Sequence, residues 1–279
     1  MKFKLWGTRG SIASAGPDTV RYGGNTASVE LRTSTGCVVI LDAGSGIRTL
    51  GKELGSEQRI DILLSHLHMD HVQGLPFFGP LLDPEVEVHL WGPISTTHTL
   101  RERLSRYLSP PLFPIRVREL PNVVFHDVPP GEFSIDTLAI TADLITHPGS
   151  TLGYRFAEDG SVLAYMPDHE PALGNPRFPG VSDWTSGYSL AKGADVLIHD
   201  AQYTEEEYST RVGWGHTTFS QLGKYATMTE VSRLVTFHHD PAHSDDFLDE
   251  AHVALMSRAD GYEVIAGKVG LEMSLLATD

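Results

Sequence analysis

The chain has 279 residues and a formal net charge of −15, from 36 acidic against 21 basic residues. Its 41% hydrophobic and 20% charged residues are proportions that allow a sizeable core in an ordinary globular protein. No apolar run approaches the roughly 20 residues needed to cross a bilayer, so we expect no membrane partner. The acidic balance and the lack of a long Lys/Arg run argue against an extended nucleic acid as partner.

The ends and the cysteine content of the chain predict its organisation and its compartment. The opening residues, Met1 to Gly7, enter a strand at once and lack the apolar region and cleavage site of a signal peptide. The single cysteine, Cys37, lies in a predicted core strand and has no partner for an intrachain disulfide. These features predict a cytoplasmic protein. No linker or internal repeat divides the chain, which predicts one domain over residues 1–279.

Short apolar strands alternate with turn clusters through most of the chain. Their β-branched and aromatic residues favour strands over helices. The strands expected in chain order are Lys2–Trp6, Ala27–Thr33, Cys37–Leu41, Ile60–Leu64, Val86–Trp91, Leu138–Thr146, Leu152–Phe156, Val162–Tyr165, Val196–His199 and Arg233–Phe237.

Three helices are expected between these strands. The first starts at Ser95 and is ended by the proline pair that begins at Pro110. The second runs from about Thr218 to Met228, and the third follows Ser244, an expected N-cap with two aspartates in the first turn. Two packed sheets with flanking helices would fit this pattern.

The densest chemistry lies directly after the strand Ile60–Leu64, where residues 66–71 read H-x-H-x-D-H. Imidazole and carboxylate are the ligand types that hold zinc and similar divalent ions. A strand that stops and turns sharply can aim His66 and His68 at one ion while Asp70 and His71 reach another. Solvated loop residues are the alternative, but four potential ligands within six residues favour a metal site.

This motif resembles the signature of the metallo-β-lactamase-fold hydrolases, and the resemblance extends from residue 1 to about residue 245. It implies an α+β fold, a four-layer αββα sandwich, with the metals at one edge where strand ends converge. Such enzymes take further ligands from later strand ends: a His, an acidic residue that bridges the metals, and a last His. An earlier Asp supports the site without binding metal. The matching positions here are His147, Asp168, His238 and Asp42.

The last ligand position has two candidates, His238 and His239. Neighbours in a strand point to opposite faces, so regular geometry lets only one of them reach the metal. Aligning the strand with its counterpart in the family favours His238. The implied cofactors are two divalent ions per chain, and the five imidazoles among the seven ligands favour zinc or manganese. The ligand set is therefore His66, His68, Asp70, His71, His147, Asp168 and His238.

Two further segments are similar to ribonuclease Z and its small-molecule relatives. Residues 213–218, Gly-Trp-Gly-His-Thr-Thr, resemble their G-H-S-T element with Thr217 in place of Ser, and residues 195–203 resemble the strand before it. The resemblance implies a phosphodiesterase that uses metal-bound hydroxide as nucleophile. His216 is the candidate proton donor to the leaving alkoxide, and Asp70 is expected both to bind metal and to orient the attacking water.

The expected substrate is a small cyclic or linear phosphodiester, such as a cyclic nucleotide or a cyclic sugar phosphate. Ribonuclease Z carries a long protruding arm that grips transfer RNA, and no corresponding basic insertion stands out here. Asn25 and Trp214 are candidate substrate contacts; an ordinary turn and a core aromatic are the competing interpretations. The resemblance also allows a homodimer, through the exposed edge around Trp91 or the helix at residues 95–108. The alternatives are a thioester or lactam hydrolase, a ribonuclease Z-like RNA endonuclease, or a non-catalytic metal-binding sensor.

Overall fold

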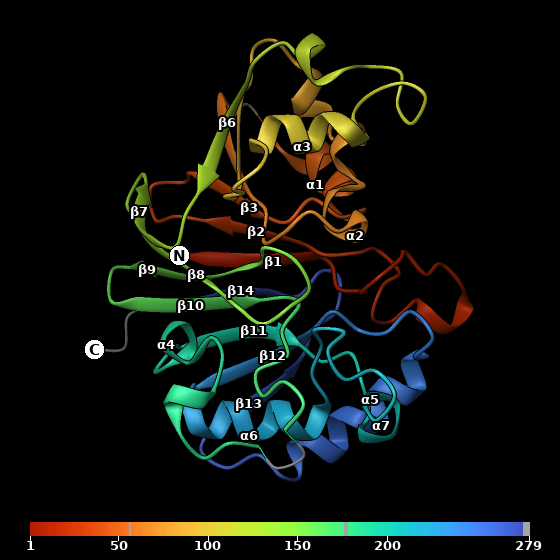
Figure 1. Ribbon diagram of the computed structural model, residues 1–279, viewed down its shortest axis with the longest axis vertical. Coiled ribbons are helices and arrows are strands. Elements are labelled where there is room, and N and C mark those ends of the chain that lie inside the picture. Colours follow the sequence, from red (N-terminus) through yellow and green to blue (C-terminus); the bar gives the residue numbers. More distant parts are fainter. Residues whose placement is uncertain (56, 176–177, 276–279) are drawn as a thin grey trace.

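Two seven-stranded sheets pack face to face, and helices cover the outer face of each sheet (Figure 1). The computed structural model describes residues 1–55, 57–175 and 178–275. The first sheet has the order β14 (Glu272–Ser274), β1 (Lys2–Gly7), β2 (Ser28–Arg32), β3 (Val38–Leu41), β4 (Arg59–Leu63), β5 (Glu87–Pro93) and β6 (Val123–Val128). The second has the order β13 (Glu263–Ala266), β12 (Arg233–Phe237), β11 (Val196–Asp200), β10 (Ser161–Met166), β9 (Leu152–Glu158), β8 (Leu138–Leu144) and β7 (Gly131–Ile135).

Helices form the two outer layers. The first sheet carries α1 (Ile47–Glu53), α3 (Leu100–Tyr107) and, at one end, α2 (Met69–Val72). The second carries α4 (Tyr188–Ala191), α6 (Phe219–Thr229) and α7 (Asp245–Met256), with α5 (Glu205–Tyr208) at the end. Short 3₁₀ turns lie at Pro17–Thr19, Leu75–Phe77, Gly79–Leu82, Val117–Glu119 and Ser182–Trp184. This arrangement confirms the expected αββα layering.

Each sheet changes from antiparallel to parallel pairing along its width. In the first sheet β1, β2 and β3 pair antiparallel and β3 to β6 pair parallel; in the second, β7 to β10 pair antiparallel and β10 to β13 pair parallel. The carboxyl ends of parallel strands meet at one edge of a sheet. Both sheets therefore bring several strand ends, and the residues that follow them, to the same end of the molecule.

Apolar side chains fill all three spaces between the four layers. The space between the sheets holds residues such as Phe3, Leu41, Phe156 and Phe237, each no more than 1% exposed. Separate clusters lie between each sheet and its own helices. Continuous burial on both faces explains why the central strands read as nearly unbroken apolar runs.

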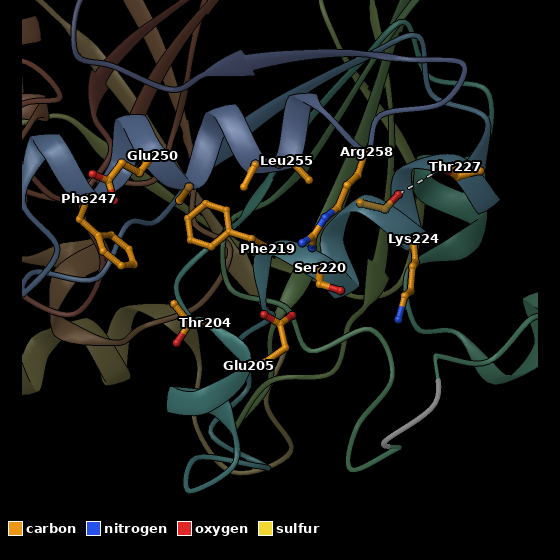
Figure 2. A pocket seen from close by; sticks show the side chains of 13 residues that line it. Thr204, Glu205, Phe219, Ser220, Lys224, Thr227, Phe247, Glu250, Leu255 and Arg258 are labelled. Carbon is orange, nitrogen blue, oxygen red and sulfur yellow. Dashed lines mark hydrogen bonds between the residues drawn. The ribbon is translucent and has the colours of Figure 1, made fainter.

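An open cavity of about 500 Å³ lies between α6 and α7, the helices that cover the second sheet (Figure 2). Its wall is mainly apolar and includes Phe219, Gly223, Ala251 and Leu255, while Lys224 and Arg258 bring positive charge. None of the residues expected to bind metal lines this cavity. Within the described ranges, no helix combines the length and apolar character needed to cross a membrane.

The ten expected strands are all present, with ends shifted by up to two residues. The first helix begins at Leu100 rather than at Ser95, because Thr99 forms a capping box with Glu102 and fixes the start of the helix there. Four strands, β6, β7, β13 and β14, and the helices α1, α2, α4 and α5 were not expected. They are short or only partly buried, so their apolar periodicity is weak.

Two local expectations are wrong. Trp91 does not lie at an exposed sheet edge, because β5 is covered by β6; its ring stacks on His126 at 3.7 Å and its Nε1 donates to Asp61. Cys37 lies just before β3 rather than within it, and it is half-buried.

Candidate metal centre

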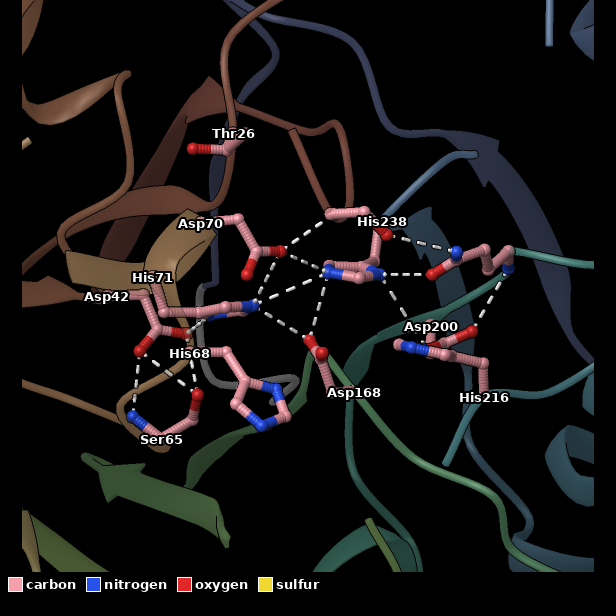
Figure 3. Close-up of polar contacts among 12 residues, drawn as sticks. Thr26, Asp42, Ser65, His68, Asp70, His71, Asp168, Asp200, His216 and His238 are labelled. Carbon is pink, nitrogen blue, oxygen red and sulfur yellow. Dashed lines mark hydrogen bonds and ion pairs between the residues drawn. The ribbon is translucent and has the colours of Figure 1, made fainter. Parts of the chain in front are cut away.

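The expected ligands converge at the end of the molecule where the strand ends meet. Figure 3 shows His68, Asp70, His71, Asp168 and His238 among them. His66 and His68 follow β4, Asp168 follows β10 and His238 follows β12. His147 follows β8, which runs in the same direction as β10 because both pair antiparallel with β9. The directions of the strands therefore explain how residues as far apart as Asp70 and His238, which are 168 positions apart, can meet.

The expected ligands form two clusters, and the first consists of His66, His68, His147 and Asp168. The Nε2 atom of His147 lies 3.1 Å from Nδ1 of His68 and 3.6 Å from Oδ2 of Asp168, and Nε2 of His66 lies 3.7 Å from the same oxygen. Three of these side chains are buried, and His68 is exposed. The cluster thus opens to solvent on the side of His68.

The second cluster consists of Asp70, His71, Asp168 and His238. Oδ1 of Asp168 lies 3.0 Å from Nε2 of His71 and 3.1 Å from Nε2 of His238. Oδ2 of Asp70 lies 3.3 Å and 3.1 Å from the same two nitrogens. Asp168 therefore faces one cluster with each of its oxygens, which is the geometry of a carboxylate that bridges two ions.

The unpaired polar atoms of the clusters fit a metal. Buried nitrogen and oxygen atoms almost always have hydrogen-bond partners. Among the described residues, Nε2 of His66 and Oδ1 of Asp168 are buried without one. Both point into the clusters, where a divalent ion would satisfy them together with the surrounding imidazoles and carboxylates.

Burial and neighbouring charge set the protonation of the ligands. Burial lowers the pKa of His147 to about 4 and the pKa of His66 well below its usual range, so both imidazoles stay neutral. Burial alone would raise the pKa of Asp168, but His238 and His71 outweigh it and hold that pKa well below its usual value. Neutral imidazoles and an ionised carboxylate are the forms that bind metal.

Asp42 contacts His71, as the supporting role predicted for it requires. It is fully buried, and its Oδ2 lies 2.8 Å from Nδ1 of His71. Ser65 donates to it through its backbone N–H and its hydroxyl, and the Tyr165 hydroxyl donates at 2.8 Å. Because Asp42 accepts at Nδ1 of His71, Nε2 of that ring is left to face the second cluster.

The two adjacent histidines after β12 point in different directions, although not by strand alternation, because β12 ends at Phe237 and His238 has a left-handed backbone with φ of 54°. His238 enters the second cluster, and its Nδ1 lies 2.9 Å from Oε1 of Gln202. His239 turns away and its Nε2 donates to the Gly267 carbonyl at 3.0 Å. The structure thus favours His238 as the ligand. The role of Gln202 was missed, although its place just after β11 put it at the same edge.

His216 forms a dyad with a residue that sequence reasoning did not assign. Its Nδ1 lies 2.6 Å from Oδ2 of Asp200, the last residue of β11, and its ring stacks on His238 with centroids 5.1 Å apart. The position of Asp200 at the end of a buried strand was the available signal. His216 therefore lies beside the second cluster, and Asp200, His216 and His238 form a further group whose ligand atoms lie close enough together to hold an ion.

The weaker candidates differ in their surroundings. Trp214 lies two residues before His216 and its side chain is 58% exposed. The Asn25 side chain accepts a hydrogen bond from Ser45 at 3.0 Å. Arg9, in the same early segment, is fully buried and donates to the carbonyls of Asp240 and His243. Arg9 therefore joins two loops inside the protein and does not line an open pocket.

The four-layer αββα fold, together with His/Asp clusters that could hold metal ions, is typical of a class of metal-dependent hydrolases. The family model described as "Beta-lactamase superfamily domain" matches residues 38–239. The chain belongs to the β-lactamase superfamily. Its fold is that of the metallo-β-lactamases, as expected.

Several characterised proteins are similar over nearly their whole length. Ribonuclease Z of Gemmatimonas aurantiaca is 26% identical over 85% of this chain and 86% of its own, and that of Haloarcula marismortui is 24% identical over 98% and 96%. Human tRNase Z, short form, has a TM-score of 0.68 at 20% identity, covering 98% of this chain and 99% of its own. A diphosphatase from the PhnP family has a TM-score of 0.69 at 18% identity, and the match covers 99% of this chain and 98% of its own. Zinc-bound PqqB from Methylobacterium extorquens has a TM-score of 0.71 at 17% identity, and the match covers 99% of this chain and 100% of its own.

These relatives correct one expectation. The exclusion of an extended nucleic acid as partner is wrong, because the similar sequences are named ribonucleases and one similar structure is named a tRNase. The net charge of −15 is a property of the whole surface. Binding of a phosphate depends instead on the local field, which a pair of divalent ions would dominate.

Proposed function

We propose that this protein is a phosphodiesterase that binds two divalent ions, zinc or manganese, at the two clusters. The observation that carries the proposal is the position of Asp168, which presents one oxygen to three imidazoles of the first cluster and the other to His71 and His238. Zinc-bound PqqB, which shares the fold, supports zinc. Two such ions neutralise phosphoryl oxygens and lower the pKa of bound water.

The chain's own residues would supply orientation and proton transfer. Asp70 is held by the backbone N–H of Ser11, which donates to its Oδ2 at 2.7 Å. From this position Asp70 would orient a water and accept its proton as the new P–O bond forms. As the P–O bond to the leaving group breaks, His216 would donate the proton on Nε2 to the departing oxygen, and Asp200 would stabilise its imidazolium form.

We propose small cyclic or linear phosphodiesters, such as a cyclic nucleotide or a cyclic sugar phosphate, as substrates. The structural likeness to a diphosphatase of the PhnP family supports small phosphate compounds. Exposed Trp214, two residues from His216, would contact the group attached to the phosphate. Cleavage of RNA is the second candidate, because the similar sequences are named ribonuclease Z.

A turnover screen tests both candidates with the same preparation. Protein loaded with zinc or manganese is offered cyclic nucleotides, a cyclic sugar phosphate, bis(p-nitrophenyl) phosphate, short RNA, a thioester and a β-lactam. We expect hydrolysis of phosphodiesters only, and no activity in Asp168→Ala treated alike. Turnover confined to the thioester or the lactam would contradict the proposal, and turnover confined to RNA would select the second candidate.

A further inference from the structure

Glu170 is a buried carboxylate placed between two loops of the site. It lies two residues after Asp168 and is fully buried. Its Oε1 accepts a hydrogen bond from the Tyr208 hydroxyl at 2.5 Å, and its Oε2 accepts from the backbone N–H of Gly215 at 3.0 Å. The N–H of Gly213 donates to both oxygens, at 3.2 and 3.1 Å. The carboxylate thus binds the backbone of residues 211–216, hereafter the His216 loop.

Besides Glu170, the His216 loop is held by the contact of His216 with Asp200, by the bond from His147 to the Gly215 carbonyl and by Arg211, whose guanidinium lies over the Tyr203 ring. Apolar packing of the loop adds little. Its large apolar side chains, Val212 and Trp214, are 48% and 58% exposed, so they contribute little burial. Gly213 and Gly215 both have left-handed backbone conformations, with φ of 84° and 87°, and glycine loses much conformational freedom when it is fixed. Hydrogen bonds to an ionised acceptor are about twice as strong as neutral ones. The hydrogen bonds of Glu170 to Gly213 and Gly215 are therefore well suited to fix the loop where apolar packing is weak.

The loop connects Glu170 to both parts of the candidate site. The Gly215 carbonyl accepts a hydrogen bond from Nδ1 of His147 at 2.9 Å, which leaves Nε2 of that ring for the first cluster. The backbone passes so close that a Cβ on Gly215 would lie 2.2 Å from that nitrogen. The next residue, His216, makes its 2.6 Å contact with Asp200.

We infer that Glu170 is a positioning residue, which fixes the His216 loop so that one metal ligand and the proton donor are oriented together. The part of this inference that concerns His216 rests on the proposed phosphodiesterase function. The part that concerns the loop and His147 does not, and it is measured without a substrate.

The test compares three variants of the metal-loaded protein. Glu170→Ala removes every acceptor, Glu170→Gln keeps one acceptor oxygen, and Tyr208→Phe removes the phenol hydroxyl while leaving both glycine amides bonded. Hydrogen exchange is followed in the peptide that contains Gly213 and Gly215. We expect exchange about 10- to 100-fold faster in Glu170→Ala, about 3- to 10-fold faster in Glu170→Gln, and within about threefold of wild type in Tyr208→Phe.

Metal affinity and leaving-group dependence give the second readout. Displacement of the Gly215 carbonyl, which accepts from His147, should weaken metal binding in Glu170→Ala by about 10- to 100-fold, as for other residues that orient a metal ligand. At saturating metal, turnover of an alkyl phosphodiester should fall more than turnover of a p-nitrophenyl ester, because only the alkoxide needs the proton from His216. Glu170→Gln should restore most of both properties.

Unchanged exchange at both glycines in Glu170→Ala overturns the inference. If that variant does not fold, unchanged exchange in Glu170→Gln overturns it equally. A wild-type protein that hydrolyses no phosphodiester refutes the proposed function, while the exchange and metal-affinity results still decide whether Glu170 positions the loop.

Discussion

The last residue of β11, Asp200, and Gln202, two positions later, orient two different imidazoles of the candidate site. Asp200 accepts from His216 and Gln202 accepts from His238, in each case at Nδ1. Both rings consequently present Nε2 toward the space in which the chemistry would occur. The second hydrogen bond of a ligand imidazole fixes its tautomer and orientation, so these two residues matter although they bind no metal in our proposal.

Replacing His216 separates proton donation from metal binding. We expect His216→Ala to retain two ions per chain and to lose roughly 10²–10⁴-fold in turnover of alkyl phosphodiesters, the range for a lost general acid. Esters of p-nitrophenol, whose leaving group needs little protonation, should lose much less. The measurements are elemental analysis and steady-state kinetics on both substrate types. Equal rates with wild type on both types, or loss of metal, would show that the role is wrong.

The pair His238 and His239 offers a matched comparison at neighbouring positions. His238→Asn should bind one ion fewer, because Nε2 of His238 is part of the second cluster. His239→Asn should keep both ions, because its ring contacts the Gly267 carbonyl on the other side of the strand. Metal content per folded chain, measured after gel filtration, checks this. The opposite pattern would exchange the two assignments.

At the scale of the elements, the helix α6 begins three residues after His216. Its N-cap, Thr218, accepts from the backbone N–H of Gln221 at 3.0 Å and donates to Glu205 at 2.7 Å. The cap therefore ties the start of α6 to α5 and limits how far the segment that carries His216 can move.

Loss of this cap should affect both stability and activity. Thr218→Ala should lower the free energy of unfolding by about 1–2 kcal/mol, the usual effect of a lost N-cap, and Thr218→Ser should restore most of it. Ser244→Ala, which removes the N-cap of α7, is the matched control. We expect a similar loss of stability in both alanine variants but a larger fall in turnover for Thr218→Ala. Denaturant titration and kinetics measure the two effects, and equal turnover in the two variants would argue against coupling of α6 to the site.

The elements also show what sequence could and could not predict. Residues 66–71 were recognisable because four ligands stand together after an apolar strand, and His147, Asp168 and His238 because each ends such a strand. Glu170, Gln202 and Tyr165 gave no such signal. Their roles depend on contacts with partners 36 to 123 positions away, which only the folded chain defines. The strands β6 and β14 were missed because half-burial and short length hide their periodicity.

At the scale of the whole molecule, buried histidines make the stability depend on pH. Burial lowers the pKa of His66, His169 and His239 well below the usual value, and it also lowers the pKa of His199. His71 and His238 behave oppositely: burial lowers the pKa of each, but Asp168 and neighbouring carboxylates outweigh burial and raise it. Burial also lowers the pKa of His68, His126, His147 and His252, so eight lowered values oppose two raised ones.

The sign of the effect follows from proton uptake. Below about pH 6.5 the unfolded chain protonates histidines that stay neutral in the folded protein, so folding becomes less favourable as the pH falls. The two histidines with raised pKa act in the other direction, since their stabilising contribution is present below pH 6.5 and is lost as the pH rises. We expect the metal-free protein to lose on the order of 1–3 kcal/mol per pH unit between pH 6.5 and 5.5. Denaturant titrations across this range measure it, and a stability that is flat or rises toward low pH would contradict the expectation.

The division of the ligands between the two sheets has a consequence for assembly. His66, His68, Asp70 and His71 follow a strand of the first sheet, whereas His147, Asp168 and His238 follow strands of the second. The chain passes from one sheet to the other between β6 and β7, and only β14 returns to pair with β1. Neither half of the chain alone can form either cluster, because each cluster combines Asp168 from the second half with ligands from the first half. Capture of metal would therefore report that the halves have docked, and two separately produced halves would regain metal affinity only by recombining.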